Sequence, residues 1–177
     1  RDQMARPTFP VGMDVMGSAP AFRALPEAGR LRFGDLTIAW CPVPHPGGCS
    51  AFRLEYRGCA IVFSGDVECA QSVLGLTQLS GGADLLLMDA QYLPEEAESR
   101  RGFGHSTPLE AVSVAATAGV SRLVLTHHDP GHNDTTLDRK LAVARAVSPV
   151  WVDNAYDGFT FCGSTVRTPR VVGGAPA

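Results

Sequence analysis

No C-x-x-C pair occurs in this sequence, and its five cysteines are odd in number. The usual ligand pattern of a structural zinc knuckle is therefore absent and a complete disulfide framework is disfavoured, so we expect reduced, partly buried thiols. The chain also lacks an apolar stretch long enough to cross a bilayer, and no secretory signal pattern opens it. A cytoplasmic protein with no membrane partner is the resulting expectation.

Basic charge is scarce as well, because 15 Lys and Arg residues face 18 Asp and Glu residues for a net charge of −3. Without a basic stripe, nucleic-acid binding through bulk electrostatics is not supported. No serine lies in a G-x-S-x-G elbow, and Gly102-x-Gly104 lacks the third glycine of a dinucleotide-binding fingerprint. What is present is an ordinary globular balance, with 45% hydrophobic residues in a length of 177 that suits one domain.

The first half of the chain predicts a small sheet followed by a strand-helix pattern. Branched and aromatic residues mark three strands, at about residues 36–43, 51–56 and 59–64. Arg57-Gly58 is a tight turn between the last two, so we expect an antiparallel meander. A helical run at residues 70–79 leads to a continuous apolar strand at residues 84–88, of the kind that is buried on both faces.

The second half predicts further strand-helix units. Thr107-Pro108-Leu109-Glu110 is a strong helix start, with Thr as N-cap and Glu completing a capping box, and Gly119 should end the helix. The remaining expected elements are a strand at residues 122–126, a helix at about 136–146, and short strands near 150–152 and 159–161 joined through Asp157-Gly158. Strands followed by strand-helix units indicate a mixed α/β layer structure.

Ionisable residues stand where the chain turns after apolar runs. His45 lies between prolines and glycines after the first predicted strand, and Asp66 follows the third. An imidazole at such a place can bind a metal through one nitrogen while the other is oriented by an acceptor. Taken singly, each residue is equally compatible with an ordinary turn, since a turn histidine with a satisfied hydrogen bond and a Gly-Asp pair are both common.

Histidines also cluster around the second half's predicted helix and strand. His105 precedes the helix N-cap, where free backbone N–H groups favour an anion and a histidine can donate a proton to a leaving oxygen. Five metal-capable side chains crowd one loop after the strand at 122–126, namely His127, His128, Asp129, His132 and Asp134. We expect His127 to point toward the site and His128 to face the other way, because strand side chains alternate.

Several of these segments, taken in order, resemble the second half of metallo-β-lactamase-fold hydrolases over about residues 5–162. The segments are Pro44-His45-Pro46-Gly47-Gly48, Ser64-Gly65-Asp66, Asp89-Ala90-Gln91-Tyr92, Gly104-His105-Ser106-Thr107 and Thr126-His127-His128-Asp129-Pro130. The branch they resemble most contains cyclic phosphodiesterases and tRNA 3′-processing endonucleases. The fold that this resemblance implies is α/β, an αβ/βα sandwich with a dinuclear metal centre at one edge of the sheets.

The resemblance also implies roles for individual residues. His45 would be a ligand to one metal, Asp66 the carboxylate that bridges two metals, and His127 a ligand to the second. His105, with Asp66, would act in catalysis, since a histidine near the scissile phosphate stabilises the transition state or protonates the leaving group. Two divalent ions, zinc by preference and manganese or iron otherwise, would supply a metal-bound hydroxide at neutral pH.

One departure from the family is serious, because the H-x-H-x-D-H motif is absent and no histidine precedes His45. We therefore expect residues 1–165 to be the C-terminal half of such a domain and residues 166–177 to be a flexible tail. On this view the chain supplies only part of the site and is inactive alone, so that a missing N-terminal part of the fold is its main partner. A homo-oligomer is also compatible with the sequence.

The preferred function is a metal-dependent phosphodiesterase acting on a small phosphodiester or a related substrate. Two alternatives stay open, a hydrolase of another ester or lactone with the same centre, and a non-catalytic binding or sensory module that keeps the fold. A soluble α/β domain with incidental loop histidines is the plain alternative.

Overall fold

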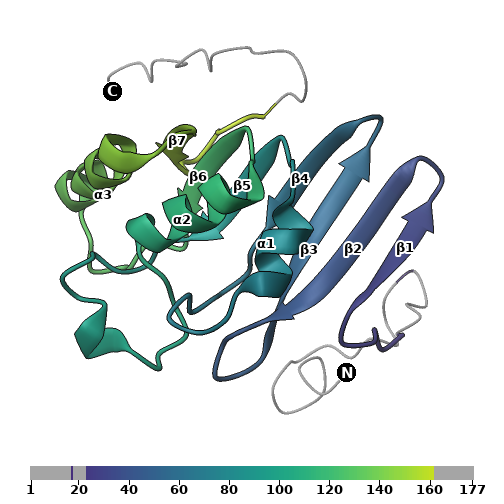
Figure 1. The fold of residues 1–177 in the computed structure, drawn as a ribbon, viewed down its shortest axis with the longest axis horizontal. Helices are drawn as coiled ribbons and strands as arrows, with labels where there is room; N and C mark the ends of the chain where they lie inside the picture. Colours follow the sequence, from purple (N-terminus) through teal and green to yellow (C-terminus); the bar gives the residue numbers. More distant parts are fainter. Residues whose placement is uncertain (1–16, 18–22, 162–177) are drawn as a thin grey trace.

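A computed structural model describes residue 17 and residues 23–161 of the chain. Its elements, shown in Figure 1, are β1 (Gly29–Phe33), β2 (Leu36–Val43), β3 (Cys49–Tyr56), β4 (Cys59–Phe63), α1 (Leu74–Ser80), β5 (Leu85–Asp89), a 3₁₀ turn (Glu98–Arg100), α2 (Pro108–Ala118), β6 (Arg122–Thr126), α3 (Asp134–Val147) and β7 (Trp151–Asn154). The described residues thus form the mixed α/β structure that the sequence predicts. None of these helices combines the length and the apolar character needed to cross a membrane.

The strands form one sheet whose spatial order follows the chain, from β1 to β7. Strands β1 to β4 pair antiparallel, which confirms the predicted meander, and β4 to β7 pair parallel. The turn between β3 and β4 consists of Arg57 and Gly58, both with positive φ, as a two-residue hairpin turn requires. Because β2, β4, β5 and β6 all run the same way, their carboxyl ends meet at one edge of the sheet.

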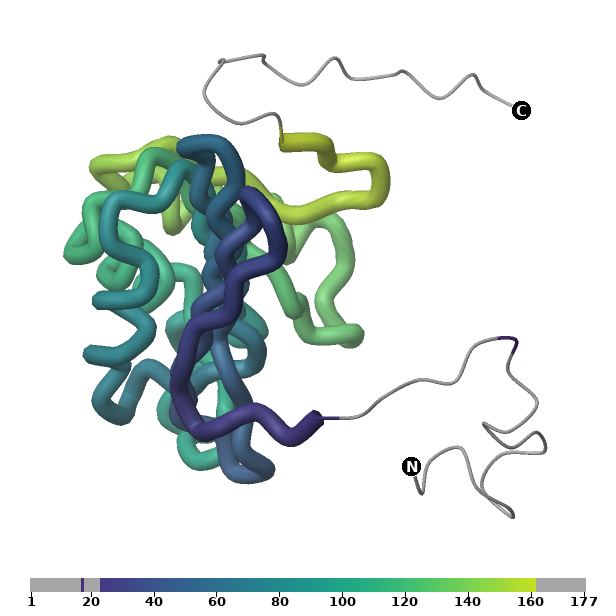
Figure 2. Tube along the Cα trace, turned by 90° about the vertical axis from the view of Figure 1, so that its right-hand side faces the viewer, coloured from purple at the N-terminus to yellow at the C-terminus, as the bar shows by residue number. Residues whose placement is uncertain are grey.

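The three helices cover one face of the sheet, where α2 lies between α1 and α3 and contacts both. Figure 2, turned by 90°, shows α1 and α2 on the same side of the strands. The core between the layers contains alternate strand residues such as Val62, Leu86 and Leu123. Helix α2 has the predicted capping box, in which Thr107 accepts from the Glu110 backbone, and ends at Gly119 in the left-handed conformation.

The other face of the sheet carries large apolar side chains that no described helix covers. Because neighbouring strand residues point to opposite faces, the register places five partly exposed residues together on it, namely Leu31, Phe33, Leu54, Tyr56 and Phe63. Phe33 is 61% exposed and Phe63 is 46% exposed. We call these five residues the open apolar face.

Three sequence predictions need correction. Strand β1 was not expected, and its alternating Gly29–Phe33 segment forms an edge strand on β2. Helix α1 begins at Leu74 rather than residue 70, because residues 68–71 form a separate turn, in which the Gln71 N–H donates to the Glu68 carbonyl, and the N–H groups of Glu68 and Cys69 anchor that turn to Pro44 and Ser106.

Residues 159–161 do not form a strand. The Phe159 N–H donates to the Tyr156 carbonyl in a turn. The aromatic residues favoured a strand by propensity, but no described strand pairs with this segment. The predicted tail at 166–177 lies outside the described residues, as do both ends of the predicted domain 1–165. Four cysteines are free and partly buried as expected, at positions 41, 49, 59 and 69, while Cys162 is outside the described part.

Candidate metal and catalytic site

The predicted site residues gather at the shared edge where four strands end. His45 follows β2, Asp66 follows β4, Asp89 ends β5 and His127 follows β6. His105 reaches the same place from the loop before α2. A sheet edge of this kind is where α/β folds present functional side chains.

His45 is oriented by the backbone of the loop that carries His105. Its Nδ1 lies 3.0 Å from the Gly104 carbonyl oxygen, which can only accept, so Nδ1 carries the proton and Nε2 keeps its lone pair. Gly104 has φ +94°, and a Cβ there would collide with the His45 ring and Pro46. The glycine therefore allows the two loops to approach, and their approach fixes the imidazole.

Asp66 lies among three imidazoles. One ligand atom from each of His45, Asp66 and His105 lies within 4.8 Å of the others, the one group of this kind in the described part of the chain. His127 is close by, with Nε2 3.7 Å from Asp66 Oδ1 and its ring stacked on His105 at 4.8 Å between centroids. All four predicted site residues are thus brought together. His105 lies close enough to His45 and Asp66 for the three side chains to contact one metal ion.

Asp89 holds His105 from behind. Its Oδ2 accepts from His105 Nδ1 at 2.7 Å and from the Val67 N–H at 3.1 Å, and its Oδ1 accepts from the Gln91 N–H. Burial raises the pKa of the Asp89 carboxyl, while the hydrogen bonds from His105 and the backbone oppose that rise. The pair leaves His105 Nε2 directed at the site, with a carboxylate placed to stabilise a positive charge on the ring.

The crowded loop after β6 does not act as one cluster. His128 is partly buried and is not part of the group around Asp66, and burial with the nearby Lys140 lowers its pKa to about 4. His132 Nε2 lies 3.3 Å from Glu96 Oε1, away from Asp66. Asp129 accepts from the Gly131 N–H, and Asp134 lies in the first turn of α3. Of the five residues only His127 reaches the site.

The donor set suits a divalent transition metal. Imidazole nitrogen with carboxylate oxygen is the ligand chemistry that zinc accepts, and manganese or iron also accept it. The fixed tautomer of His45 adds to the fit, since metal-binding histidines commonly donate their second N–H to a backbone carbonyl. These residues fit a metal, although three or four donors spread over two positions make an incomplete shell.

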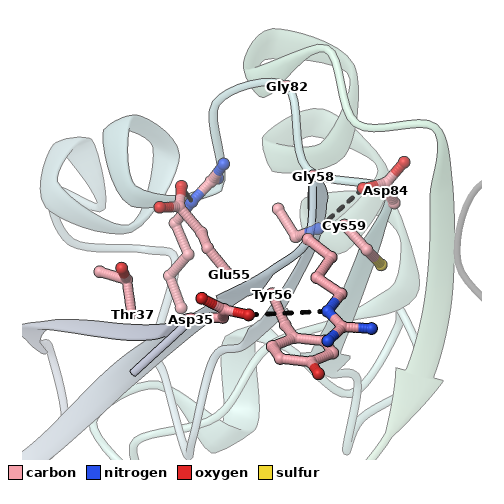
Figure 3. Close-up of a pocket in the computed structure, with 11 residues that line it drawn as sticks. Asp35, Thr37, Glu55, Tyr56, Gly58, Cys59, Gly82 and Asp84 are labelled. Atoms are coloured by element: carbon pink, nitrogen blue, oxygen red, sulfur yellow. Dashed lines mark hydrogen bonds and ion pairs between the residues drawn. The ribbon is translucent and has the colours of Figure 1, made fainter. Parts of the chain in front are cut away.

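A cavity of about 360 Å³ lies at the opposite edge of the sheet, and Figure 3 shows its residues. Its charged groups are already satisfied, since Arg57 pairs with Asp35 and the Asp84 carboxylate accepts from the Ala60 N–H. Arg53 donates to Glu55, to the Leu79 carbonyl in the last turn of α1 and to the Gly81 carbonyl that follows it. With no histidine in its wall, this cavity lacks the chemistry of the strand-end site.

Two buried residues were missed as contributors from the sequence. Asp89 ends an apolar strand at the same edge as the histidines, and that position was a usable signal for its role. Lys140, fully buried on α3, donates to the Ala90 and Gln91 carbonyls at 3.0 and 2.6 Å. No local pattern distinguishes it from a surface lysine, because its partners are about fifty residues away.

Residues 8–128 match the family described as the beta-lactamase superfamily domain, and the motif residues at the sheet edge fall within that range. The chain belongs to the metallo-β-lactamase superfamily. The match confirms the resemblance and the fold class that the sequence indicated. Within the superfamily, the structure is similar to the metallo-β-lactamase fold protein YhfI of Bacillus subtilis, with a TM-score of 0.64 and 26% identity over 77% of this chain and 54% of that one.

Sequence relatives of this superfamily member include two proteins named ribonuclease Z. That of Brevibacillus brevis is 42% identical over 52% of this chain, and that of Trichodesmium erythraeum is 32% identical over 79%. The chain spans only 29% and 39% of their respective lengths. The short form of human tRNase Z is also similar, with a TM-score of 0.54 and 26% identity over 59% of this chain and 40% of that one.

Proposed function

We propose that this chain supplies the C-terminal part of a metal-dependent phosphodiesterase that cleaves RNA. The observation that carries the proposal is the Asp89–His105 pair facing His45 and Asp66, because it combines a proton donor with a metal-binding set. The relatives named ribonuclease Z favour RNA over the small phosphodiester that the sequence suggested. The net charge of −3 then requires local or partner-supplied contacts to the RNA phosphates.

In this proposal His105 is the general acid. Its Nδ1 proton is held by Asp89, so protonation of Nε2 creates an imidazolium beside a buried carboxylate. That Nε2 proton can pass to the leaving oxygen of the cleaved phosphodiester, a transfer that contributes about 10²- to 10⁴-fold in rate. Asp89 fixes the tautomer and the ring orientation, and it stays a positioning residue because its oxygens face Val67, Gln91 and His105 rather than the substrate.

His45, Asp66 and His127 are the proposed metal ligands, with Asp66 between two divalent ions. Such ions, zinc by preference, supply Lewis acidity at the phosphoryl oxygens and a nucleophile at neutral pH. Asp66 is the residue that would be shared by two ions, because one of its carboxylate oxygens lies within 4.8 Å of a ring nitrogen of His45 and of His105, and Oδ1 lies 3.7 Å from His127 Nε2. The hydrogen bond between His45 Nδ1 and the Gly104 carbonyl keeps the His45 ring in place for binding.

An N-terminal part of the fold completes the proposed site. The open apolar face supports this, since five large side chains at neighbouring sheet positions would otherwise contact water. A second sheet packed on that face would also bring further ligands to the same edge. We refer to this chain together with that part, whether in one polypeptide or as a separate piece, as the complete protein.

The test measures metal content and cleavage in the complete protein and in the 177 residues alone. We expect about two ions per complete protein, cleavage of a tRNA precursor and of a base-free phosphodiester, and little activity from the chain alone. His127→Ala should lose metal, whereas His105→Ala should keep metal and lose about 10²- to 10⁴-fold in kcat. His132→Ala, paired with Glu96 outside the site, is the matched histidine control.

Three outcomes would contradict the proposal. Absence of metal and of cleavage in the complete protein would favour a binding or sensory module. Faster cleavage of a lactone than of either phosphodiester would favour the other class of hydrolase. Full activity of the 177 residues alone would remove the need for an N-terminal part.

A further inference from the structure

Glu68 is a buried carboxylate next to the site that the proposed reaction does not use. It is 4% exposed, and its Oε1 accepts from the Gly102 N–H at 2.6 Å. Its Oε2 is buried and has no hydrogen-bond partner among the described residues. A buried carboxylate oxygen of this kind is costly unless a donor reaches it.

Glu68 lines a small cavity that the proposed general acid, His105, also lines. The cavity has a volume of about 40 Å³, and its other lining residues are Ala70, Ala97, Arg100, Arg101 and Glu110. A single water molecule needs about 10–15 Å³ of such space. The cavity therefore has room for small polar groups, and a group that reaches Glu68 Oε2 must donate to a carboxylate.

Tyr92, Arg100 and Phe103 form a stacking surface on the loop between β5 and α2. The Arg100 guanidinium lies 5.6 Å from the ring centre of Tyr92 and 5.9 Å from that of Phe103. Tyr92 in turn meets His105 edge to face at 5.9 Å, while Phe103 is 56% exposed. Exposed aromatic and guanidinium planes are the surfaces on which unpaired RNA bases stack.

We propose that this is a nucleobase subsite, in which a base adjoining the scissile phosphate stacks on Phe103 and Arg100 and inserts its exocyclic amino group toward Glu68 Oε2. The inference rests on the proposed RNA-cleaving function and names the base that the site selects. Cytosine N4 and adenine N6 carry such an amino group, and carboxylates accept from it. Uracil presents a carbonyl oxygen there, which the carboxylate repels, so the subsite prefers cytosine or adenine to uracil.

The first experiment measures the binding of CMP, AMP and UMP to the complete protein by NMR, following the Gly102 amide that donates to Glu68. We expect CMP or AMP to bind about tenfold or more tightly than UMP. In Glu68→Gln the ratio should fall to about one to two, because an amide both donates and accepts. Glu68→Asp keeps the charge but shortens the reach, and should also lose the preference.

Glu95→Gln is the matched control, because Glu95 lies on the same loop but pairs with Arg139 at the surface and does not line the cavity. It should keep the wild-type ratio. Equal binding of all three nucleotides, or the same preference in Glu68→Gln, would overturn the inference and leave the cavity as a water site only. Folding of each variant is checked by the dispersion of the remaining amide signals.

The second experiment compares kcat/KM for RNA substrates that differ in the nucleotide on either side of the cleaved bond. A preference of about tenfold for cytosine or adenine over uracil on one side, lost in Glu68→Gln, supports the subsite. Cleavage of the base-free phosphodiester should be the same in wild type and Glu68→Gln. If that substrate is cleaved but no base preference appears, the subsite fails while the proposed function stands; if it is not cleaved, the function itself fails.

Discussion

Gly104 illustrates how one residue couples two loops of the site. Its positive φ and missing side chain let its carbonyl reach His45 Nδ1, and the same segment carries His105. The functional histidines are thus held by a backbone contact between residues 59 positions apart. The sequence indicated His45 and His105 as separate candidates, but the contact that joins them depends on tertiary structure.

Gly104→Ala should therefore disrupt the site more than its backbone strain alone would. We expect metal affinity or kcat of the complete protein to fall about 10- to 100-fold, because the added Cβ displaces the His45 ring. Gly102→Ala is the control, since it has φ +85° but no atom near the added Cβ. Equal losses in the two variants, measured by metal titration and kcat, would show that strain rather than the His45 contact matters.

At the scale of elements, α3 is fastened to the loop after β5 by Lys140. The buried ammonium donates to the Ala90 and Gln91 carbonyls, directly after Asp89. Burial lowers the pKa of Lys140 to about 8, against an ordinary value of 10.5. The neutral amine still has two N–H groups for the two carbonyls, so loss of the proton removes the buried charge without breaking the tie.

The pH dependence of stability follows from this lowered pKa. Between about pH 8 and 10.5 the unfolded chain holds a proton that the folded chain has lost, so the free energy of unfolding should rise with pH by up to about 3 kcal/mol. Lys140→Met should lack this rise. Urea unfolding at pH 7.5 and 10 gives the change in the free energy of unfolding for wild type and for Lys140→Met. Subtracting one change from the other removes the contribution of tyrosine and cysteine titration, which both proteins share. Identical pH dependence in both would contradict the prediction.

At the scale of the molecule, the described residues present a sheet with one face covered by helices and one face that no described helix covers. Three helices bury alternate strand residues on the first, whereas the open apolar face leaves Phe63 and its neighbours partly in water. The chain spans only 29% and 39% of the lengths of two relatives, and we propose that the open apolar face contacts the remaining part of the fold. The proposed two-part site follows from the same geometry.

Phe63→Glu tests whether the open apolar face is covered in the complete protein. In the complete protein the substitution buries a charge, so we expect a loss of about 3 kcal/mol or more in the free energy of unfolding. Val147→Glu, on the 60% exposed end of α3, should change it by no more than about 0.5 kcal/mol. Chemical unfolding of both variants makes the comparison. Equally small effects in the complete protein would mean that nothing packs on the open face.

The sequence alone determined most elements and the members of the site. Period-two strands, the Thr107 capping box and the turn at Arg57-Gly58 are local signals, set by residues a few positions apart, and the structure confirms them. Positions after apolar strands indicated His45, Asp66 and His127 as candidates, a position before a helix N-cap indicated His105, and the structure brings the four together. Strand β1 escaped because its pairing with β2, rather than its own propensity, makes it a strand.

Tertiary structure alone decided what supports those residues. Four hydrogen bonds join positions 16 to 59 residues apart, namely Asp89–His105, Lys140–Ala90, Gly102–Glu68 and His45–Gly104. Such contacts arise when parallel strands bring their carboxyl ends to one edge, which no local pattern encodes. The start of α1 also depends on such contacts, since the turn at residues 68–71 that precedes it is anchored by N–H groups that donate to Pro44 and Ser106.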